Sequence, residues 1–244
     1  MGTKTTYDAM FSTVIGKEYD MLKLICPAAT EMSRLVGESV SASNNKSEIL
    51  HVVELGGGTG ITTLALLSAK NNLHILSVDN EPTMQQQAKL SLQQWVDSGC
   101  LSFSAEDALT ALQRLEDNSV DIVASAYTLH NFFYSYREQV IREVFRVLKP
   151  DGEFINGDRY GLDDIRQHTR TIQAEVSEWF KVLTPLNRND LLEQWLVHLF
   201  NDESEDHVMR EGVALQQLQE AGFIDIKLSH RNAVNALVTA IKPA

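Results

Sequence analysis

Four glycines and two acids form the pattern in this chain that is best suited to bind a ligand. The first acid and three of the glycines read Glu54-x-Gly56-x-Gly58-x-Gly60, and Asp79 ends the next apolar run. Glycine has no Cβ, so a ligand can approach the backbone of such a loop closely. An acid at the end of the following strand can bind a pair of ribose hydroxyls. The pattern therefore predicts a site for a ligand that contains ribose.

The spacing of these glycines differs from that of a dinucleotide-binding loop. Such a loop reads G-x-G-x-x-G and directs a helix N-terminus at a pyrophosphate. Here the spacing is one residue tighter, and Glu54 precedes the loop. A carboxylate at that place would repel a pyrophosphate, whereas it suits a ligand that carries an ammonium and a sulfonium. The motif resembles the E/D-x-G-x-G-x-G of the class I S-adenosylmethionine-dependent methyltransferases, and this resemblance implies S-adenosyl-L-methionine as the cofactor.

The residues around the glycines predict the elements that would position them. Val52 and Val53 lie in an apolar run of strand length, which is typical of a strand buried on both faces. After the loop, residues 61–68 have helical spacing, and residues 73–78 give the next buried strand. Further strands are predicted at 101–104, 120–126 and 153–157, with a closing antiparallel pair at 223–228 and 233–241. Helices are predicted from residue 82 onward, at 108–115, around 141–148 and at 208–220.

This order of elements resembles the class I methyltransferase domain over roughly residues 45–244. Residues 146–153 (RVLKPDGE) are similar to the family's L-K-P-G-G turn, with Asp151 in place of the first glycine. The resemblance implies an α/β fold with a Rossmann-like seven-stranded methyltransferase sheet and helices on both faces. Residues 1–44 are expected to form an N-terminal helical cap, or a lid over the ligand, in which Pro27 starts a helix that ends near Val40. A helical insert is expected at about 160–201, where small-molecule methyltransferases have acceptor-binding walls.

The resemblance also implies which residues contact the cofactor. Asp107 follows the third strand, where an acid of the family accepts a hydrogen bond from the adenine amino group; Asp107 is equally suited to cap the helix that follows. The cofactor contacts expected at the matching positions are Glu54, Gly56, Gly57, Gly58, Gly60, Asp79, Asn80, Glu106, Asp107, Ala108 and Ala126.

The residues after the fourth strand are the candidates for chemistry, because ligands of an open α/β sheet lie outside the carboxyl ends of the strands. Methyl transfer is an in-line displacement, in which alignment alone can supply about 7–11 kcal/mol of the barrier. A base helps where the acceptor must lose a proton, and His130 is the candidate base, with Tyr127 as a second catalytic candidate. Both side chains could equally serve packing. The candidates for acceptor binding are Asn131, Arg159, Tyr160 and Arg188.

A second polar cluster, between Asp158 and His168, contains carboxylates and a histidine. Its spacing matches no known set of metal ligands, and Asp163 and Asp164 are suited to cap the helix that starts at Ile165. No metal is therefore expected. The acid run at 202–206 is expected to be a solvated loop near the N-terminus of the next helix.

Composition and charge narrow the classes of partner. Among 244 residues there are 33 acids and 21 bases, a net charge of −12. This balance argues against binding to a nucleic-acid backbone, and the N/D-P-P-Y tetrapeptide of amino-directed nucleic-acid methyltransferases is absent after the fourth strand. The two cysteines indicate a reducing cytoplasm, and no apolar run is long enough to span a membrane. The expected partner is a small-molecule acceptor, and a homodimer stays open.

The leading prediction is an S-adenosylmethionine-dependent transfer of a methyl group to a small-molecule acceptor. Two alternatives stay open. Residues 78–84 (VDNEPTM) and the long insert are similar to carboxy-S-adenosylmethionine synthase, which modifies the cofactor and holds its carboxylate donor with an arginine. Arg188 is the candidate for that arginine. The other alternative is a non-catalytic module that binds the cofactor or a partner protein.

Overall fold

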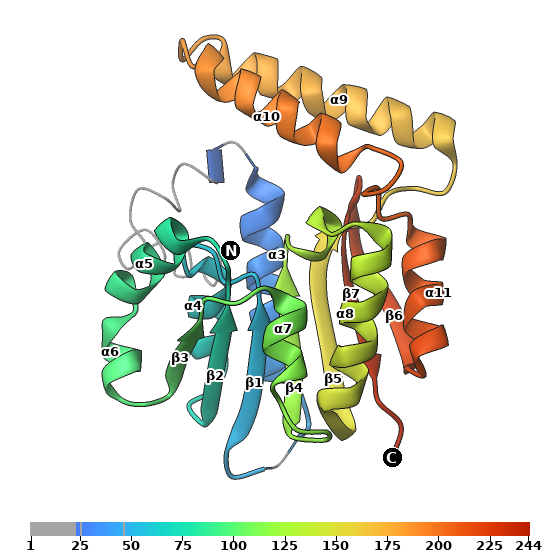
Figure 1. The fold of residues 1–244 in the computed structure, drawn as a ribbon. Helices are drawn as coiled ribbons and strands as arrows, with labels where there is room; N and C mark the ends of the chain where they lie inside the picture. Colours follow the sequence, from blue (N-terminus) through green and yellow to red (C-terminus); the bar gives the residue numbers. More distant parts are fainter. Residues whose placement is uncertain (1–22, 25, 46) are drawn as a thin grey trace.

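A seven-stranded sheet forms the centre of the molecule (Figure 1). The computed structural model describes residues 23, 24, 26–45 and 47–244. The strand order is β3-β2-β1-β4-β5-β7-β6; the first five strands along the chain are parallel, and β7 is antiparallel to β5 and β6. This confirms the predicted Rossmann-like sheet. The strands are β1 (Leu50–Leu55), β2 (Leu73–Val78), β3 (Leu101–Ser104), β4 (Val120–Ala126), β5 (Leu148–Arg159), β6 (Ile224–Asn232) and β7 (Asn235–Ile241).

Helices cover both faces of this sheet, and each face has its own hydrophobic cluster. On one face, α3 (Pro27–Ala42) and α4 (Ile61–Leu67) pack over the strands. On the other face, α7 (Ala108–Gln113), α8 (Tyr134–Val147) and α11 (Glu211–Ala221) supply the buried side chains. Successive residues of a strand point to opposite faces, so Val52 of β1 belongs to the first cluster and Val53 to the second. The prediction that this strand is buried on both faces is confirmed.

Helix α3 is part of the helical layer on the sheet. It begins at Pro27, as predicted, and ends at Ala42. A Cβ on Gly37 would lie 2.8 Å from the carbonyl oxygen of Ala65 in α4, and a Cβ on Gly157 of β5 would lie 2.9 Å from the Cβ of Met32. The helix therefore approaches α4 and β5 more closely than a residue with a side chain would allow. The earlier part of the predicted N-terminal cap, residues 1–22, lies outside the described residues.

Strand β5 is longer than the prediction of 153–157. It begins at Leu148, because the predicted turn at 150–152 is an irregularity within the strand rather than its boundary. Asp151 has a φ of +62°, and its N–H donates a hydrogen bond to the carbonyl of Lys242. The backbone of this turn is thus bonded to the residue that follows β7, which lets β5 continue through it.

Two helices also differ in extent. The helix that begins at Pro82 is divided at Leu92 into α5 (Pro82–Ser91) and α6 (Gln93–Asp97). Helix α11 begins at residue 211 and not at 208. The reason is that the N–H of Gly161 donates to the carbonyl of Met209 and the N–H of Glu211 donates to the carbonyl of Gly161, so this segment pairs with the chain after β5.

A pair of helices forms the insert, over the carboxyl ends of the parallel strands (Figure 1). They are α9 (Ile165–Leu183) and α10 (Asn189–Asp202). Asp164 caps α9, because its carboxylate accepts a hydrogen bond from the N–H of Gln167. The two helices share a separate hydrophobic cluster that includes Trp179 and Leu192. Within the described part of the chain, no helix combines the length and the apolar character needed to cross a bilayer.

Candidate active site

The glycine loop between β1 and α4 has a left-handed backbone at three positions. Gly56, Gly58 and Gly60 have φ values of +74°, +52° and +93°, which residues with a Cβ rarely adopt. The N–H groups of Gly56 and Gly57 donate to the carbonyl of Val78, at 2.8 and 3.2 Å. The loop is thus bonded to the end of β2, directly before Asp79.

The glycines of this loop have different surroundings. A Cβ on Gly56 would lie 1.9 Å from the Oγ1 of Thr128, and a Cβ on Gly57 would lie 2.0 Å from the Oγ of Ser77. At Gly58 a Cβ would meet no described atom within 4 Å. Gly56 and Gly57 therefore permit close packing inside the protein, whereas Gly58 borders open space that a ligand can use.

Asp79 lies beside this open space and is held in place by backbone groups. Its Oδ2 accepts a hydrogen bond from the N–H of Gly58 at 2.7 Å, and its Oδ1 accepts one from the N–H of Glu81 at 2.8 Å. Each oxygen of an ionised carboxylate can accept a second hydrogen bond. The residues present therefore fit an adenosyl ligand: Gly58 leaves the room for it, and Asp79 offers two oxygens to its ribose.

The structure corrects the role that the sequence suggested for Glu54. Its side chain is fully buried beneath the loop, where Oε2 accepts a hydrogen bond from the hydroxyl of Thr63 at 2.6 Å. Its Oε1 has no hydrogen-bond partner among the described residues. Burial raises the pKa of Glu54 to about 7. The repulsion of a pyrophosphate that is expected of a carboxylate beside the loop is therefore weakened, because Glu54 is buried and only partly ionised at neutral pH.

The other predicted cofactor residues follow neighbouring strands. Val78 of β2 pairs with Ser104 of β3, so Asp79 and the residues after Ser104 end at the same edge of the sheet. Asp107 caps α7: it accepts hydrogen bonds from the backbone and side chain of Thr110 and from the hydroxyl of Tyr136, which together lower its pKa to about 2. Further along this edge lie exposed Asn80, partly buried Glu106, and buried Ala108 and Ala126.

His130 and Asp158 form a buried pair at the ends of the adjacent strands β4 and β5. The Nδ1 of His130 lies 2.5 Å from Oδ1 of Asp158, and the two residues are 4% and 0% exposed. The N–H of Leu129 donates to Oδ2 of Asp158 and the N–H of Arg159 donates to Oδ1, at 2.9 and 2.8 Å. Burial alone would raise the pKa of Asp158, but the His130 ring, the N–H of Arg159 and the side-chain amide of Asn156 lower it. Asp158 is thus ionised and fixes the orientation of the His130 ring.

The other ring nitrogen of His130 faces the insert across a cavity of about 190 Å³. Its Nε2 lies 3.7 Å from Oδ2 of Asp202, and the Nε2 of His198 lies 3.5 Å from the same oxygen. Asp202 is buried, and its Oδ1 has no hydrogen-bond partner among the described residues. The prediction that the acid run at 202–206 is a solvated loop is wrong at Asp202, which ends α10 and points at His130.

Tyr127 and Asn131 also line this cavity. The ring of Tyr127 packs edge-on against the ring of His130, with centroids 5.6 Å apart. Its hydroxyl donates a hydrogen bond to Oδ1 of Asn235, and burial raises the pKa of Tyr127 well above its ordinary value. The hydroxyl is therefore engaged within the protein, and the aromatic ring is the part of Tyr127 that shapes the site. The amide of Asn131 donates to the carbonyl of Tyr127 at 3.3 Å.

The structure does not support three of the predicted acceptor contacts. Arg159 lines the small cavity, but its guanidinium forms two hydrogen bonds with Glu175, at 2.8 and 3.1 Å, and one with Glu203 at 3.4 Å. Tyr160 is 2% exposed and belongs to the core. Arg188 precedes α10 and pairs with Asp190, and it lines neither the cavity beside His130 nor the larger cavity beneath α9. Arg159 is thus neutralised by the insert, and neither Tyr160 nor Arg188 reaches the site.

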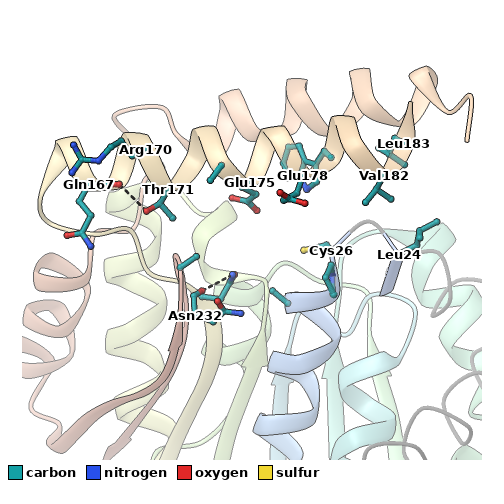
Figure 2. Close-up of a pocket in the computed structure, with 16 residues that line it drawn as sticks. Leu24, Cys26, Gln167, Arg170, Thr171, Glu175, Glu178, Val182, Leu183 and Asn232 are labelled. Atoms are coloured by element: carbon teal, nitrogen blue, oxygen red, sulfur yellow. Dashed lines mark hydrogen bonds between the residues drawn. The ribbon is translucent and has the colours of Figure 1, made fainter. Parts of the chain in front are cut away.

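A second cavity of about 740 Å³ separates α9 from the sheet and the start of α3 (Figure 2). Cys26 and Trp179 line both this cavity and the smaller one. Figure 2 shows Glu175 and Val182 on α9 across from Cys26. The two cavities therefore adjoin at Cys26 and Trp179, and His130 lines the smaller one.

Sequence reasoning missed the partners of His130. The sequence groups Asp158 with a different cluster, assigns Asp202 to a solvated loop and indicates no role for His198. One signal was available for Asp158, because residues after adjacent parallel strands meet at one edge of a sheet. His198 and Asp202 are four residues apart on one helix, so they share a face. No local pattern indicates that this face lies over β4.

Comparisons with known proteins show what the central part of the chain is similar to. Residues 53–156 match the family model described as a methyltransferase domain. A demethylmenaquinone methyltransferase from Leptospira interrogans is 36% identical over 115 residues, which are 47% of this chain and 45% of that protein. This chain therefore matches less than half of the length of that relative.

Two further matches extend over more of the chain. A carboxy-S-adenosyl-L-methionine synthase from Pseudoalteromonas translucida is 22% identical over 192 residues, 71% of this chain and 76% of that protein. The solved structure of an O-methyltransferase family protein from Burkholderia thailandensis superposes with a TM-score of 0.65 at 16% identity; the match covers 99% of this chain and 61% of that one. At this identity the superposition establishes the shared fold.

Proposed function

We propose that the protein transfers a methyl group from S-adenosyl-L-methionine to a small-molecule acceptor, because residues 53–156 match the family model described as a methyltransferase domain. The observation that carries the proposal is the pairing of an open glycine with a fixed acid: Gly58 borders free space, and Asp79 is held beside it at 2.7 Å. When bound, the cofactor supplies a methyl carbon that is activated by a positively charged sulfur. Asp79 binds the ribose, and Asp107 receives the adenine at the end of β3.

The cavities support a small acceptor. A volume of about 740 Å³ lies within the range of small-molecule sites, and this cavity adjoins, at Cys26 and Trp179, the chamber that His130 lines. We assign to His130 the activation of the acceptor: Asp158 holds its Nδ1, so that Nε2 faces the chamber and takes the proton that the acceptor loses. Asp158 acts through His130 and is a positioning residue.

The carboxy-S-adenosylmethionine synthase alternative receives less support from the geometry. It needs a cationic side chain that holds the carboxylate of a donor molecule. Arg188 is outside the two cavities, and Arg159 is already paired with Glu175 and Glu203. The similarity over 192 residues keeps this activity as an outcome that the following experiment must be able to detect.

Turnover tests the proposal. The protein is incubated with S-adenosyl-L-methionine and fractions of a metabolite extract below about 3 kDa, and S-adenosylhomocysteine is measured by mass spectrometry. We expect its release to depend on one fraction. His130→Ala should lower that rate by about 10²–10⁴-fold and leave cofactor affinity from calorimetry within about threefold. His74→Ala is the matched control, because His74 is an exposed histidine on β2.

Three outcomes would contradict the proposal. Cofactor binding without turnover in any fraction would indicate a binding module. A carboxymethylated cofactor on addition of prephenate would favour the synthase activity. Equal loss of turnover in His130→Ala and His74→Ala would remove His130 from the mechanism.

A further inference from the structure

The end of α10 brings a histidine and an acid to the free nitrogen of His130. One donor atom from each of His130, His198 and Asp202 lies within 4.8 Å of the other two. The contacts with Asp202 measure 3.7 and 3.5 Å, longer than hydrogen bonds. Donors that share one ion at about 2.1 Å lie about 3.4 Å apart in a tetrahedral site. The two distances from Asp202 to the histidine nitrogens are thus closer to those between ligands of a shared ion than to those of direct hydrogen bonds.

The state of Asp202 gives a second, independent indication of a ligand. Asp202 is 6% exposed, lines the small cavity, and its Oδ1 has no hydrogen-bond partner among the described residues. A buried carboxylate oxygen without a partner is costly. The guanidinium of Arg159, which lines the same cavity, is already bonded to Glu175 and Glu203. A bound cation would satisfy the carboxylate of Asp202.

The other side of His130 also has the form of a metal site. A histidine that binds a metal through one ring nitrogen usually donates the other N–H to a carboxylate, which fixes the ring and makes it a stronger ligand. Here the Nδ1–H of His130 donates to Oδ1 of Asp158 at 2.5 Å, and Asp158 is itself held by the N–H groups of Leu129 and Arg159. The lone pair of Nε2 is therefore directed at the cavity.

We propose that His130, His198 and Asp202 bind one divalent transition-metal ion, such as Zn²⁺ or Co²⁺, at the junction of the insert and the sheet. Two neutral imidazoles and one carboxylate suit this class of ion. Three protein ligands leave a coordination position open toward the cavity, as in catalytic rather than structural sites. The proposal departs from the sequence expectation of no metal, because two of the three ligands come from α10.

Binding of the ion does not depend on the proposed methyl transfer. In the metal-loaded protein Nε2 of His130 is a ligand, so an acceptor hydroxyl would be activated by coordination to the ion instead of by His130 directly. The test is therefore made without cofactor and acceptor. A failure of methyl transfer then leaves the metal result unchanged, and a failure of metal binding leaves His130 free to act as the base.

The experiment uses the full chain, without an affinity tag and treated with a chelator. Co²⁺ is titrated in while its visible absorption is recorded, and Zn²⁺ affinity is measured by competition with a fluorescent chelator. We expect one ion per chain. His198→Ala and Asp202→Asn should each weaken binding about tenfold or more, and Asp158→Asn should weaken it about 10–100-fold. His230→Ala and Asp206→Asn, at exposed positions, should leave it unchanged.

The result is decisive even if a buried variant fails to fold. His198 is partly exposed, with 47% of its side chain accessible, so His198→Ala should keep the fold, as circular dichroism can verify. Binding of substantially less than one ion per chain by the unaltered protein would overturn the proposal. Equal affinity in His198→Ala and the unaltered protein would overturn it as well.

Discussion

Gly58 is the residue on which the proposed cofactor binding depends most directly. It has a left-handed backbone and no described atom within 4 Å of the place where a Cβ would stand. Gly99 shares both properties, with a φ of +79°, but lies in the turn before β3. Substitutions at the two positions therefore distinguish a loss of folding stability, which a strained backbone causes at both, from a loss of cofactor affinity, which is expected at Gly58 alone.

We expect Gly58→Ala and Gly99→Ala to lower the free energy of unfolding by a similar amount, about 1–2 kcal/mol, because both place a Cβ on a left-handed backbone. Gly58→Ala should also weaken binding of S-adenosyl-L-methionine by about 1–3 kcal/mol, since the added carbon overpacks the ligand. Calorimetry and denaturant titration measure the two effects. Unchanged cofactor affinity in Gly58→Ala would show that the ligand lies elsewhere.

Glu54 makes stability depend on pH in a defined direction. Its pKa is raised from 4.5 to about 7 by burial, so the folded state favours the neutral acid. The destabilisation is absent below about pH 4.5, where Glu54 is protonated in both states, and is complete above pH 7. A difference of about 2.5 units corresponds to about 3 kcal/mol.

Glu54→Gln removes this ionisation. The gain in unfolding free energy of Glu54→Gln over the unaltered protein should therefore increase by about 3 kcal/mol between pH 4.5 and pH 8. Urea titrations across this range measure it, and the exposed Glu116→Gln is the control. A difference that stays constant with pH would mean that Glu54 ionises normally in the folded protein.

At the scale of elements, the insert is attached to the sheet mainly by charge. Arg159 at the end of β5 binds Glu175 of α9 and Glu203 after α10, and Glu203 also contacts His168 at 2.5 Å. The apolar side chains of α9 and α10 instead pack on one another. The position of the insert over the strand ends therefore depends on ionic contacts between the buried Arg159 and two partly buried glutamates.

Arg159→Met should lower the free energy of unfolding by about 3–5 kcal/mol, because it leaves Glu175 without its cation and Glu203 with His168 as its remaining partner. We expect a loss near 3 kcal/mol, because the side chains of Glu175 and Glu203 are 20% and 22% exposed and water can solvate part of their charge. Hydrogen exchange should rise most in residues 165–202. Lys181→Met is the control: its pair with Glu178 is 65% exposed on both sides, so its removal should change stability by less than about 1 kcal/mol. A uniform rise in exchange would refute separate attachment of the insert.

At the scale of the whole molecule, the sequence predicted the strands whose positions follow from runs of neighbouring residues. The runs at 73–78, 101–104 and 120–126 give β2, β3 and β4 with the predicted bounds. The sequences of β2 and β4 are mostly apolar, as expected for strands inside a parallel sheet, whereas β3 is a half-buried edge strand. The burial of Glu54 and the contact of Asp202 with His130 were not predictable in this way. Both depend on how α4 and α10 pack against the strands, which no local spacing specifies.

Ligand binding should be visible in the stability of the whole chain. A ligand that binds the folded state at 100 times its Kd adds about 2.7 kcal/mol, which for a chain of this size corresponds to about 5–10 °C in Tm. We expect this shift with S-adenosyl-L-methionine and none with NAD at the same concentration. A shift with NAD alone would overturn the assignment of the glycine loop.

The separate hydrophobic cluster of α9 and α10 has a consequence for how such proteins diverge. A substitution that changes the contact between Trp179 and Trp195 alters the wall of the small cavity while the packing of the seven strands stays as it is. Under the proposed function, substitutions in α9 and α10 alone would therefore suffice to change the acceptor, and the residues of the glycine loop would stay as they are.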